Sequence, residues 1–154
     1  VLLDGSTPQI SLAASAKRQL RHYRIGPASR PYDDPSYEYV SHAFNGNGAR
    51  PYRPAHLQAR DVAGDISVSW VRRTRIDGDS WDLSDVPLGE SNESYHLRIV
   101  QAGQTVREAV VSQPEWTYTQ AQRASDLVAG AYSIEVAQIS ETYGSGPYAT
   151  ITLS

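Results

Sequence analysis

Apolar and polar residues alternate most clearly in the last part of the chain. Tyr132, Ile134 and Val136 alternate with smaller or polar neighbours, and this two-residue period is typical of a half-buried strand. A Gly-Ser-Gly-Pro cluster over residues 144–147 interrupts the pattern, which resumes over residues 148–153. The pattern therefore predicts two antiparallel strands joined by a loose turn.

The same period predicts five further strands between residues 55 and 118. It is strongest over residues 66–71 and 95–99, where every second residue is large and apolar. We expect seven strands in all, at residues 55–59, 66–71, 95–99, 104–111, 116–118, 132–139 and 148–153. Seven strands over about 100 residues are typical of an all-β, immunoglobulin-like sandwich.

Two segments between these strands have a different character. Thr119 and Gln122 have the spacing of a capping box, which predicts one or two helical turns after the strand at 116–118. Residues 72–92 contain Asp77, Gly78 and Pro87 and show no strand period. We expect this segment to be a long loop.

Residues 1–54 lack the regular period of the sandwich. Residues 13–20 favour a short helix, Gly26 and Pro27 favour an interruption, and residues 37–44 favour a strand. The Gly- and Pro-rich residues 45–54 favour a linker. We therefore expect residues 1–54 to be the end of an upstream domain plus a linker, and residues 55–154 to be the sandwich.

Composition limits the function classes only slightly. The 154 residues carry a net charge of −3, which gives no general attraction to nucleic acid or anionic lipid. The sequence has no apolar run near the roughly 20 residues of a transmembrane helix and no cysteine. We expect no signal peptide, because Asp4 and Gly5 interrupt the apolar start. It begins with Val1 and contains no methionine, so we expect it to be part of a longer polypeptide.

Candidate catalytic and metal-binding residues are few. Asp33, Asp34 and Glu38 are the nearest group of carboxylates to a glycosidase pair, but the neighbouring prolines favour a role in a turn. The four histidines, His22, His42, His56 and His96, do not have zinc-site spacing. No nucleophile elbow is present. We assign no catalytic, metal-binding or cofactor-binding residue.

Basic and aromatic residues indicate contact surfaces instead. The basic runs 17–24 and 72–75 could contact phosphate. Ion pairing within or between subunits, with Asp77, Asp79 and Asp82 nearby, is the favoured interpretation because little net positive field remains. We expect Trp70 and Trp116 to lie in the core of the sandwich. Trp81 is expected either to fold back over that core or to be exposed and contact a partner protein. The candidate interface residues are Arg72, Arg73, Arg75, Trp81, Tyr143 and Tyr148.

Residues 55–154 resemble a fibronectin type III domain. The similarity lies in Trp70 at the end of the second strand, in Tyr-x-Leu-x-Ile over residues 95–99, and in Leu-x-x-Gly-x-Tyr-x-Ile-x-Val over residues 127–136. Tyr132 stands at the position of the tyrosine-corner residue, in a corner one residue tighter than usual. The missing cysteine pair argues against an antibody-type domain.

A second resemblance covers nearly the whole chain. Four ordered segments, at residues 22–28, 33–37, 50–57 and 70–81, resemble the C-terminal end of the large baseplate hub protein of siphophage-like tails and gene transfer agents. That family carries a glycoside-hydrolase-like barrel nearer its N-terminus, outside these residues. The resemblance implies a virion protein at the tail tip, assembled as a homotrimer with other baseplate and tail proteins.

The resemblance also implies a function for this chain. It predicts a structural component for tail-tip assembly and for recognition or penetration of the host cell envelope, through contact with an envelope glycan or receptor. The predicted contact edges are the loop 72–92 and the turn 143–147. The alternative is an accessory carbohydrate-binding module of a glycoside hydrolase, whereas catalysis by these residues alone is not expected.

Overall fold

The computed structural model describes residues 12–78 and 85–154. The chain divides between Gly48 and Ala49 into two compact units. Sequence patterning favoured a boundary between residues 54 and 55, at the end of the linker.

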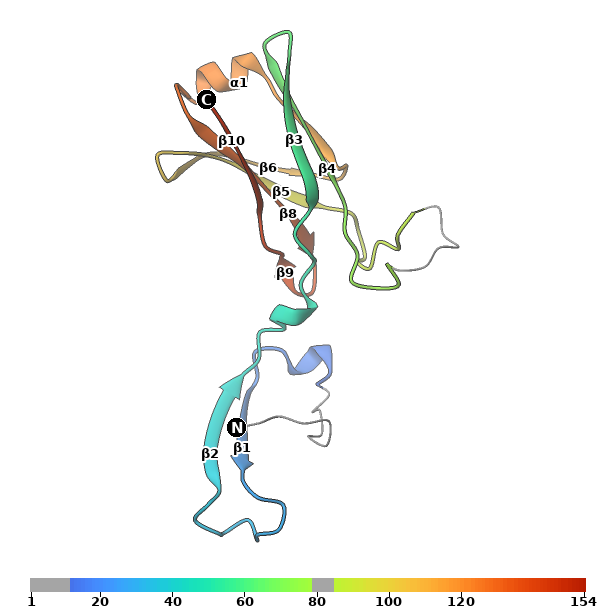
Figure 1. The fold of residues 1–154 in the computed structure, drawn as a ribbon, viewed down its shortest axis with the longest axis vertical. Helices are drawn as coiled ribbons and strands as arrows, with labels where there is room; N and C mark the ends of the chain where they lie inside the picture. The colour runs from blue at the N-terminus through green and yellow to red at the C-terminus, as the bar shows by residue number, and fades with distance from the viewer. Residues whose placement is uncertain (1–11, 79–84) are drawn as a thin grey trace. The chain divides into compact units, whose positions relative to one another are not determined.

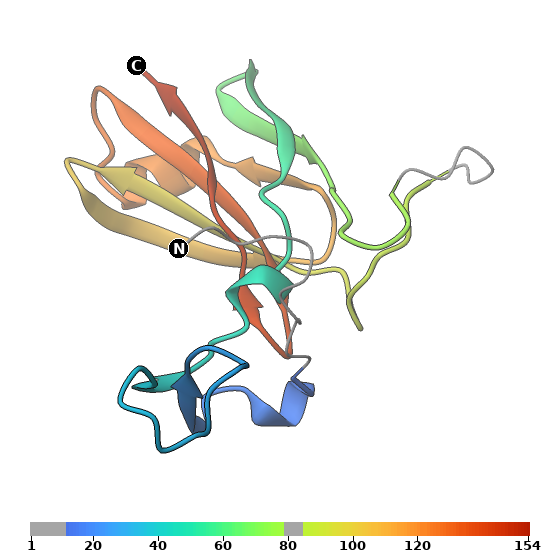
Figure 2. The same ribbon diagram turned by 60° about the horizontal axis from the view of Figure 1, so that its bottom comes forward.

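The first unit is built around a two-stranded antiparallel ribbon (Figure 2). Strand β1 (Leu20–Ile25) pairs with β2 (Glu38–Ala43) along its full length, from Leu20 opposite Ala43 to Ile25 opposite Glu38. A short 3₁₀ turn, η1 (Ala14–Ala16), precedes the ribbon. The strand predicted at residues 37–44 is therefore confirmed.

The helix predicted at residues 13–20 is wrong beyond its first turn. Arg18 has a φ of 62°, in the left-handed region that a right-handed helix cannot accommodate. Its N–H donates to the carbonyl of Phe44 at 2.9 Å. The chain thus turns at Arg18 and enters β1, because pairing with β2 offers its backbone groups partners that a short isolated helix does not.

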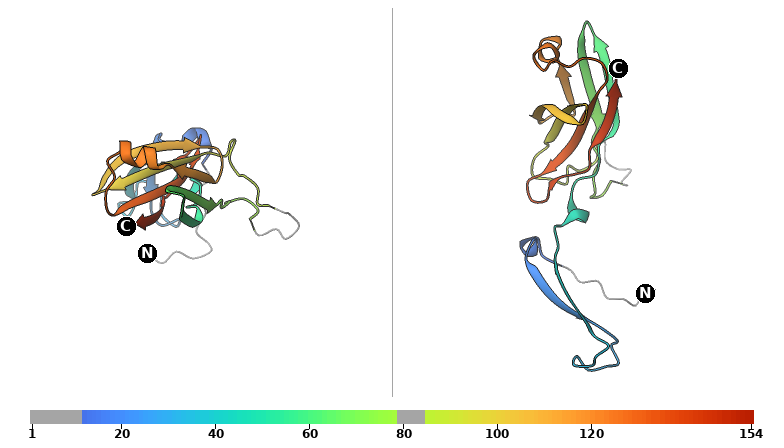
Figure 3. Two further views of the ribbon diagram at one scale, coloured as in Figure 1. Left: turned by 90° about the horizontal axis from the view of Figure 1, so that it is seen from above. Right: turned by 90° about the vertical axis from the view of Figure 1, so that its left-hand side faces the viewer.

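The second unit is a sandwich of two antiparallel sheets (Figures 1 and 3). One sheet has the order β3-β4-β7, with β3 at Ala55–Val62, β4 at Asp65–Val71 and β7 at Glu115–Tyr118. The other has the order β10-β8-β5-β6, with β5 at Tyr95–Gln101, β6 at Gln104–Val111, β8 at Tyr132–Ser140 and β10 at Ala149–Leu153. A short β9 (Gly144–Ser145) also pairs with β8, and η2 spans Asn47–Ala49.

This arrangement of three strands against four is that of a fibronectin type III-like, all-β fold. All seven predicted strands exist, and the closing pair β8–β10 is antiparallel, with Ile151 opposite Ile134. Two hairpins turn through two residues with positive φ, at Ala63–Gly64 and Ala102–Gly103. These tight turns suit the right-handed twist of the flanking strands.

The core follows the two-residue period read from the sequence. Val68, Leu97, Ile134 and Val136 have at most 1% of their surface exposed. Trp70 is 4% exposed and packs edge-on against the Tyr95 ring at 5.1 Å. The other buried members of this cluster are Ile66, Ile99, Tyr118 and Tyr132.

The helix predicted after the strand at 116–118 is confirmed as α1 (Gln120–Ser125). Both capping-box bonds are present: the Gln122 N–H donates to Thr119 Oγ1 at 3.2 Å, and the Thr119 N–H donates to Gln122 Oε1 at 3.0 Å. The Gln120 N–H donates to Asp65 Oδ1 at 2.8 Å. The helix start is thereby attached to the β3–β4 hairpin.

Candidate functional site

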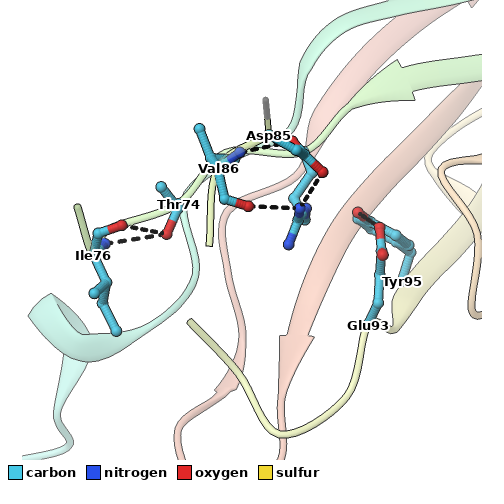
Figure 4. Close-up of polar contacts among 7 residues, drawn as sticks. Thr74, Ile76, Asp85, Val86, Glu93 and Tyr95 are labelled. Atoms are coloured by element: carbon cyan, nitrogen blue, oxygen red, sulfur yellow. Dashed lines mark hydrogen bonds and ion pairs between the residues drawn. The ribbon is translucent and has the colours of Figure 1, made fainter. Parts of the chain in front are cut away.

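Arg72 follows the end of β4 and turns its guanidinium back onto its own loop. Its Nη2 donates to Asp85 Oδ2 at 2.9 Å and to the Val86 carbonyl at 2.8 Å. The Arg72 side chain is only 13% exposed, whereas that of Asp85 is 78% exposed. Figure 4 shows Asp85 and Val86 side by side at this point. Arg72 therefore fixes the returning half of the loop.

Arg75 makes the second cross-connection in this loop. Its Nη2 donates to Glu90 Oε1 at 3.0 Å, and its guanidinium carbon lies 5.6 Å from the centre of the Tyr143 ring. Arg73 lies instead over the Tyr52 ring, at 5.1 Å. A guanidinium over an aromatic ring is attracted by the ring quadrupole. The three arginines are thus directed to three different sets of partners.

The loop has further internal bonds. Thr74 Oγ1 accepts from the Ile76 N–H at 3.1 Å and donates to the Ile76 carbonyl at 3.0 Å (Figure 4). Ser91 Oγ donates to Glu141 Oε2 at 2.9 Å. Together with the Arg75–Tyr143 contact, this bond brings the loop beside the β8–β9 turn. Residues of the predicted loop 72–92 therefore lie beside Tyr143, the first residue of the predicted turn 143–147.

We call residues 72–76, 85–91 and 141–143 together the loop surface. Four of the six predicted interface residues lie on it: Arg72, Arg73, Arg75 and Tyr143. Trp81 lies outside the described residues. The acidic partners of Arg72 and Arg75 are Asp85 and Glu90, two residues that the sequence interpretation did not name. Asp85 and Glu90 lie 13 and 15 positions after their arginines in the chain. No local sequence pattern therefore indicates the two pairs.

Tyr95 lies at the start of β5, shortly after the loop ends. Its hydroxyl donates to Glu93 Oε1 at 2.6 Å, and Figure 4 shows the two side chains together. Burial of the phenol, followed by its hydrogen bond to Glu93, raises the pKa of Tyr95. The hydroxyl therefore stays protonated and acts as a structural donor.

Tyr148 belongs to a second group, on the outer face of the four-stranded sheet. The Arg98 guanidinium lies 3.9 Å from the Tyr148 ring centre, and the Tyr148 hydroxyl is 2.7 Å from His96 Nδ1. Arg98 Nε also donates to Glu135 Oε2 at 3.0 Å. Strand register explains this group, because Arg98 lies opposite Glu135 on β8 and opposite Glu108 on β6. The sequence pattern indicated Tyr148 as an interface residue, but it did not indicate Arg98 or Glu135, and it indicated His96 only as a histidine without zinc-site spacing.

The carboxylate and histidine residues considered as catalytic or metal-binding candidates do not form such a site among the described residues. Asp34 accepts from the Ser36 N–H at 2.9 Å and from the Ser36 hydroxyl at 2.6 Å, and these bonds lower the pKa of its carboxyl. This is the turn role expected of it. Across residues 12–78 and 85–154, no three His, Cys, Asp or Glu side chains are grouped so as to hold a metal ion.

A cavity lies elsewhere, at the α1 end of the sandwich. It measures about 530 Å³, and Ile66, Arg123, Tyr132 and Leu153 are among the residues that line it. Of the predicted interface residues that the structure describes, none lines this cavity. Within the described part of the chain, no helix is long and apolar enough to cross a bilayer.

No protein-family model and no curated protein matches this chain. Among solved structures, domains d3–d4 of the rat CD45 extracellular region are similar at 13% identity and a TM-score of 0.47, covering 100% of this chain and 73% of that one. The FN1–FN3 domains of chicken CNTN1 are similar at 16% identity and a TM-score of 0.45, covering 88% and 43%.

A further similar structure is the Clostridium perfringens spore cortex lytic enzyme SleM, at 10% identity and a TM-score of 0.44. The match covers 68% of this chain and 28% of that enzyme. Similarities at these identities and TM-scores do not indicate a function. The assignment of the sandwich fold rests on the strand orders β3-β4-β7 and β10-β8-β5-β6.

Proposed function

We propose that this chain is a structural module of a phage-like tail baseplate, within a hub or tail-tip protein, and that it makes its contacts through the loop surface. The proposal starts from the ordered resemblance over residues 22–81. One structural observation supports it further: the loop and the turn expected to make contacts are joined by Ser91–Glu141 and Arg75–Tyr143. The loop therefore lies beside the first residue of the turn, as one contact area would require.

The loop surface suits recognition by shape and charge. Its guanidinium groups are oriented by carboxylates and rings, which reduces the conformational entropy lost when a partner binds. Arg73 is exposed and stacked on Tyr52, so it is the member best suited to reach a partner. The sandwich supplies the rigid scaffold from which such loops bind.

The proposed partners are other tail proteins and a host-envelope receptor or glycan, with three copies of the chain in the particle. In this proposal the chain binds and positions and does not catalyse. Localisation at the tail tip of a virion follows from the same proposal.

The carbohydrate-binding alternative gains no comparable support. A sugar-binding platform needs an open aromatic face, and one face of the Tyr143 ring and one face of the Tyr148 ring already carry a guanidinium. Trp81 lies outside the described residues. No observation therefore favours this alternative over assembly and recognition.

Arg73→Glu in the particle-forming protein tests the proposal. We expect at least a tenfold drop in the number of complete tails, in adsorption to host cells, or in both. The matched control is Arg60→Glu, which reverses an exposed charge on β3, away from the loop surface. If both variants assemble and adsorb like the unmodified particle, the loop surface makes no contact and the proposal fails.

A further inference from the structure

The cavity at the α1 end of the sandwich has the size of a ligand site. Figure 1 shows α1, the β3–β4 hairpin and the last residues of β10 together at this end. Residues of both sheets and of α1 line the cavity, so it lies between the sheets rather than on the face of one. Its volume of about 530 Å³ is within the range of roughly 300–1,000 Å³ that small-molecule sites in proteins have.

Part of the cavity wall is apolar. Ile66 and Tyr132, which are 6% and 7% exposed, belong to the core and reach the cavity from opposite sheets. Val128 and Leu153 also line the cavity and pack against the same core. A ligand with an apolar body would remove this surface from water, which is favourable.

The polar part of the wall comes from Asp61, Gln120 and Arg123. The Asp61 carboxylate accepts from the Gly64 N–H at 2.9 Å, and Arg123 Nη2 donates to the Gly64 carbonyl. Arg123 Nε is buried and has no hydrogen-bond partner among the described residues. Across residues 12–78 and 85–154, no carboxylate lies within 4.0 Å of the Arg123 guanidinium. Its positive charge is therefore not paired within this part of the chain.

An organic anion is the ligand class that suits Arg123. A guanidinium has five N–H donors in a planar fork that matches a carboxylate. A half-buried charge without a partner costs free energy, and an anion in the cavity would offset that cost. Asp61 adds a negative charge to the same wall, so the cavity favours a ligand with one carboxylate at Arg123 over a ligand with several negative groups.

Leu127, next to the cavity-lining Val128, has an unusual backbone for an exposed apolar residue. Its φ is 56°, and its N–H donates to the Ala124 carbonyl at 3.2 Å at the end of α1. Glycine commonly occupies this position, because a Cβ is unfavourable at positive φ. Leu127 is also 84% exposed, so packing offsets little of this cost. Strained residues of this kind are concentrated at ligand and active sites.

We propose that this cavity binds a small organic carboxylate with a compact apolar body. The carboxylate accepts hydrogen bonds from Arg123, the apolar body fills the space beside Ile66 and Leu153, and Leu127 contacts the ligand at the mouth. The site shares no described residue with the loop surface. The inference therefore does not depend on the proposed place in a tail.

Titration of the protein with naphthylacetate, followed in NMR spectra of its methyl groups, tests the proposal. We expect saturable shifts of Ile66, Val128 and Leu153, with NOEs from the naphthyl protons to these methyl groups. Naphthylacetamide has the same body without the charge. It should bind about tenfold more weakly, because charge-assisted hydrogen bonds are stronger than neutral ones. Shifts that do not saturate, shifts only outside the cavity, or equal binding of the amide would overturn the proposal.

Substitutions on α1 then test the location of the site. Ala124 lines the cavity and is exposed on the helix, so Ala124→Trp should block naphthylacetate binding in a folded protein. The matched control is Ala121→Trp, which enlarges an exposed residue of the same helix outside the cavity wall and should keep binding. Arg123→Gln should weaken binding about tenfold, as loss of a charged donor does. Folded Ala124→Trp and Arg123→Gln variants that bind like the natural protein would overturn the assignment.

Leu127→Gly separates binding from folding. Glycine removes the Cβ that makes a φ of 56° unfavourable, so thermal stability should not fall. The affinity for naphthylacetate should fall severalfold, because the apolar contact at the mouth is lost. An unchanged affinity in this variant would overturn the role of Leu127 in the site.

Discussion

Arg107 holds Asp126 through two hydrogen bonds, from Nε to Oδ2 at 2.6 Å and from Nη2 to Oδ1 at 2.8 Å. The Tyr118 hydroxyl donates to the same Oδ2 at 2.7 Å. Arg107 lies on β6 and Tyr118 on β7, so a carboxylate at the end of α1 connects the two sheets. Only 9% of the Asp126 side chain is exposed. This connection closes one end of the sandwich.

The first prediction concerns the acid stability of this connection. The Arg107 guanidinium, followed by the Tyr118 hydroxyl, holds the pKa of Asp126 below its ordinary value of 3.8. A lowered folded-state pKa stabilises the fold above the unfolded-state value and loses this effect as the pH falls through the folded value. Asp126→Asn should therefore lower the urea midpoint at neutral pH, with a difference from the natural protein that shrinks below pH 3.8.

Glu115→Gln is the matched control, since Glu115 is exposed on β7. Its urea midpoint should follow that of the natural protein throughout the titration. A difference between Asp126→Asn and the natural protein that stays constant at low pH would show that the ionised carboxylate is not the source of the stability.

The second prediction concerns the Arg75–Glu90 pair of the loop surface. The Glu90 side chain is only 8% exposed, so removing its partner leaves a poorly solvated carboxylate. Arg75→Ala should cost about 1–3 kcal/mol in the free energy of unfolding. The double variant Arg75→Ala, Glu90→Gln should cost less, because the unpaired charge is gone. Equal losses in the single and double variants would mean that the pair is not coupled.

The third prediction concerns Gly146, which lies against Pro51. A Cβ at Gly146 would clash with the Pro51 carbonyl oxygen, a backbone atom that cannot move aside as a side chain can. Gly146→Ala should therefore lower the unfolding free energy by about 1–3 kcal/mol. At Gly48 an added Cβ meets nothing within 4 Å, so Gly48→Ala should leave thermal stability unchanged. Unaltered stability of Gly146→Ala would contradict the close contact.

The fourth prediction concerns the start of α1. Thr119→Ala removes the acceptor for the Gln122 N–H and should cost about 1 kcal/mol, as N-cap truncations commonly do. Thr150→Ala, at an exposed position on β10, should cost much less. Chemical denaturation of the two variants compares the effects, and equal midpoints would indicate that the cap contributes nothing.

Much of the sandwich could be predicted from its sequence because its signals are local. Alternation at Ile66, Val68 and Trp70 identifies the buried face of β4, and Thr119 with Gln122 identifies the helix start. Each of these signals lies within a few residues. The strand β1 was missed because Arg18, with its positive φ, reverses the chain where propensity alone favoured a helix.

The surroundings of the candidate interface residues were only partly predictable. Arginines and tyrosines could be named as anchors from their surroundings in the sequence. Their partners Asp85, Glu90 and Glu135 could not, because each contact depends on how a loop closes or on strand register. Register brings Glu135 opposite Arg98 across 37 positions of the chain, and no local pattern carries that information.

A cryo-electron microscopy map of the particle that contains this chain tests the central proposal most directly. The account predicts density for the sandwich of residues 49–154 at the tail tip, with Arg73 and the loop surface against a neighbouring protein or facing the host. A complete map in which the tail tip has no density for this sandwich would contradict it.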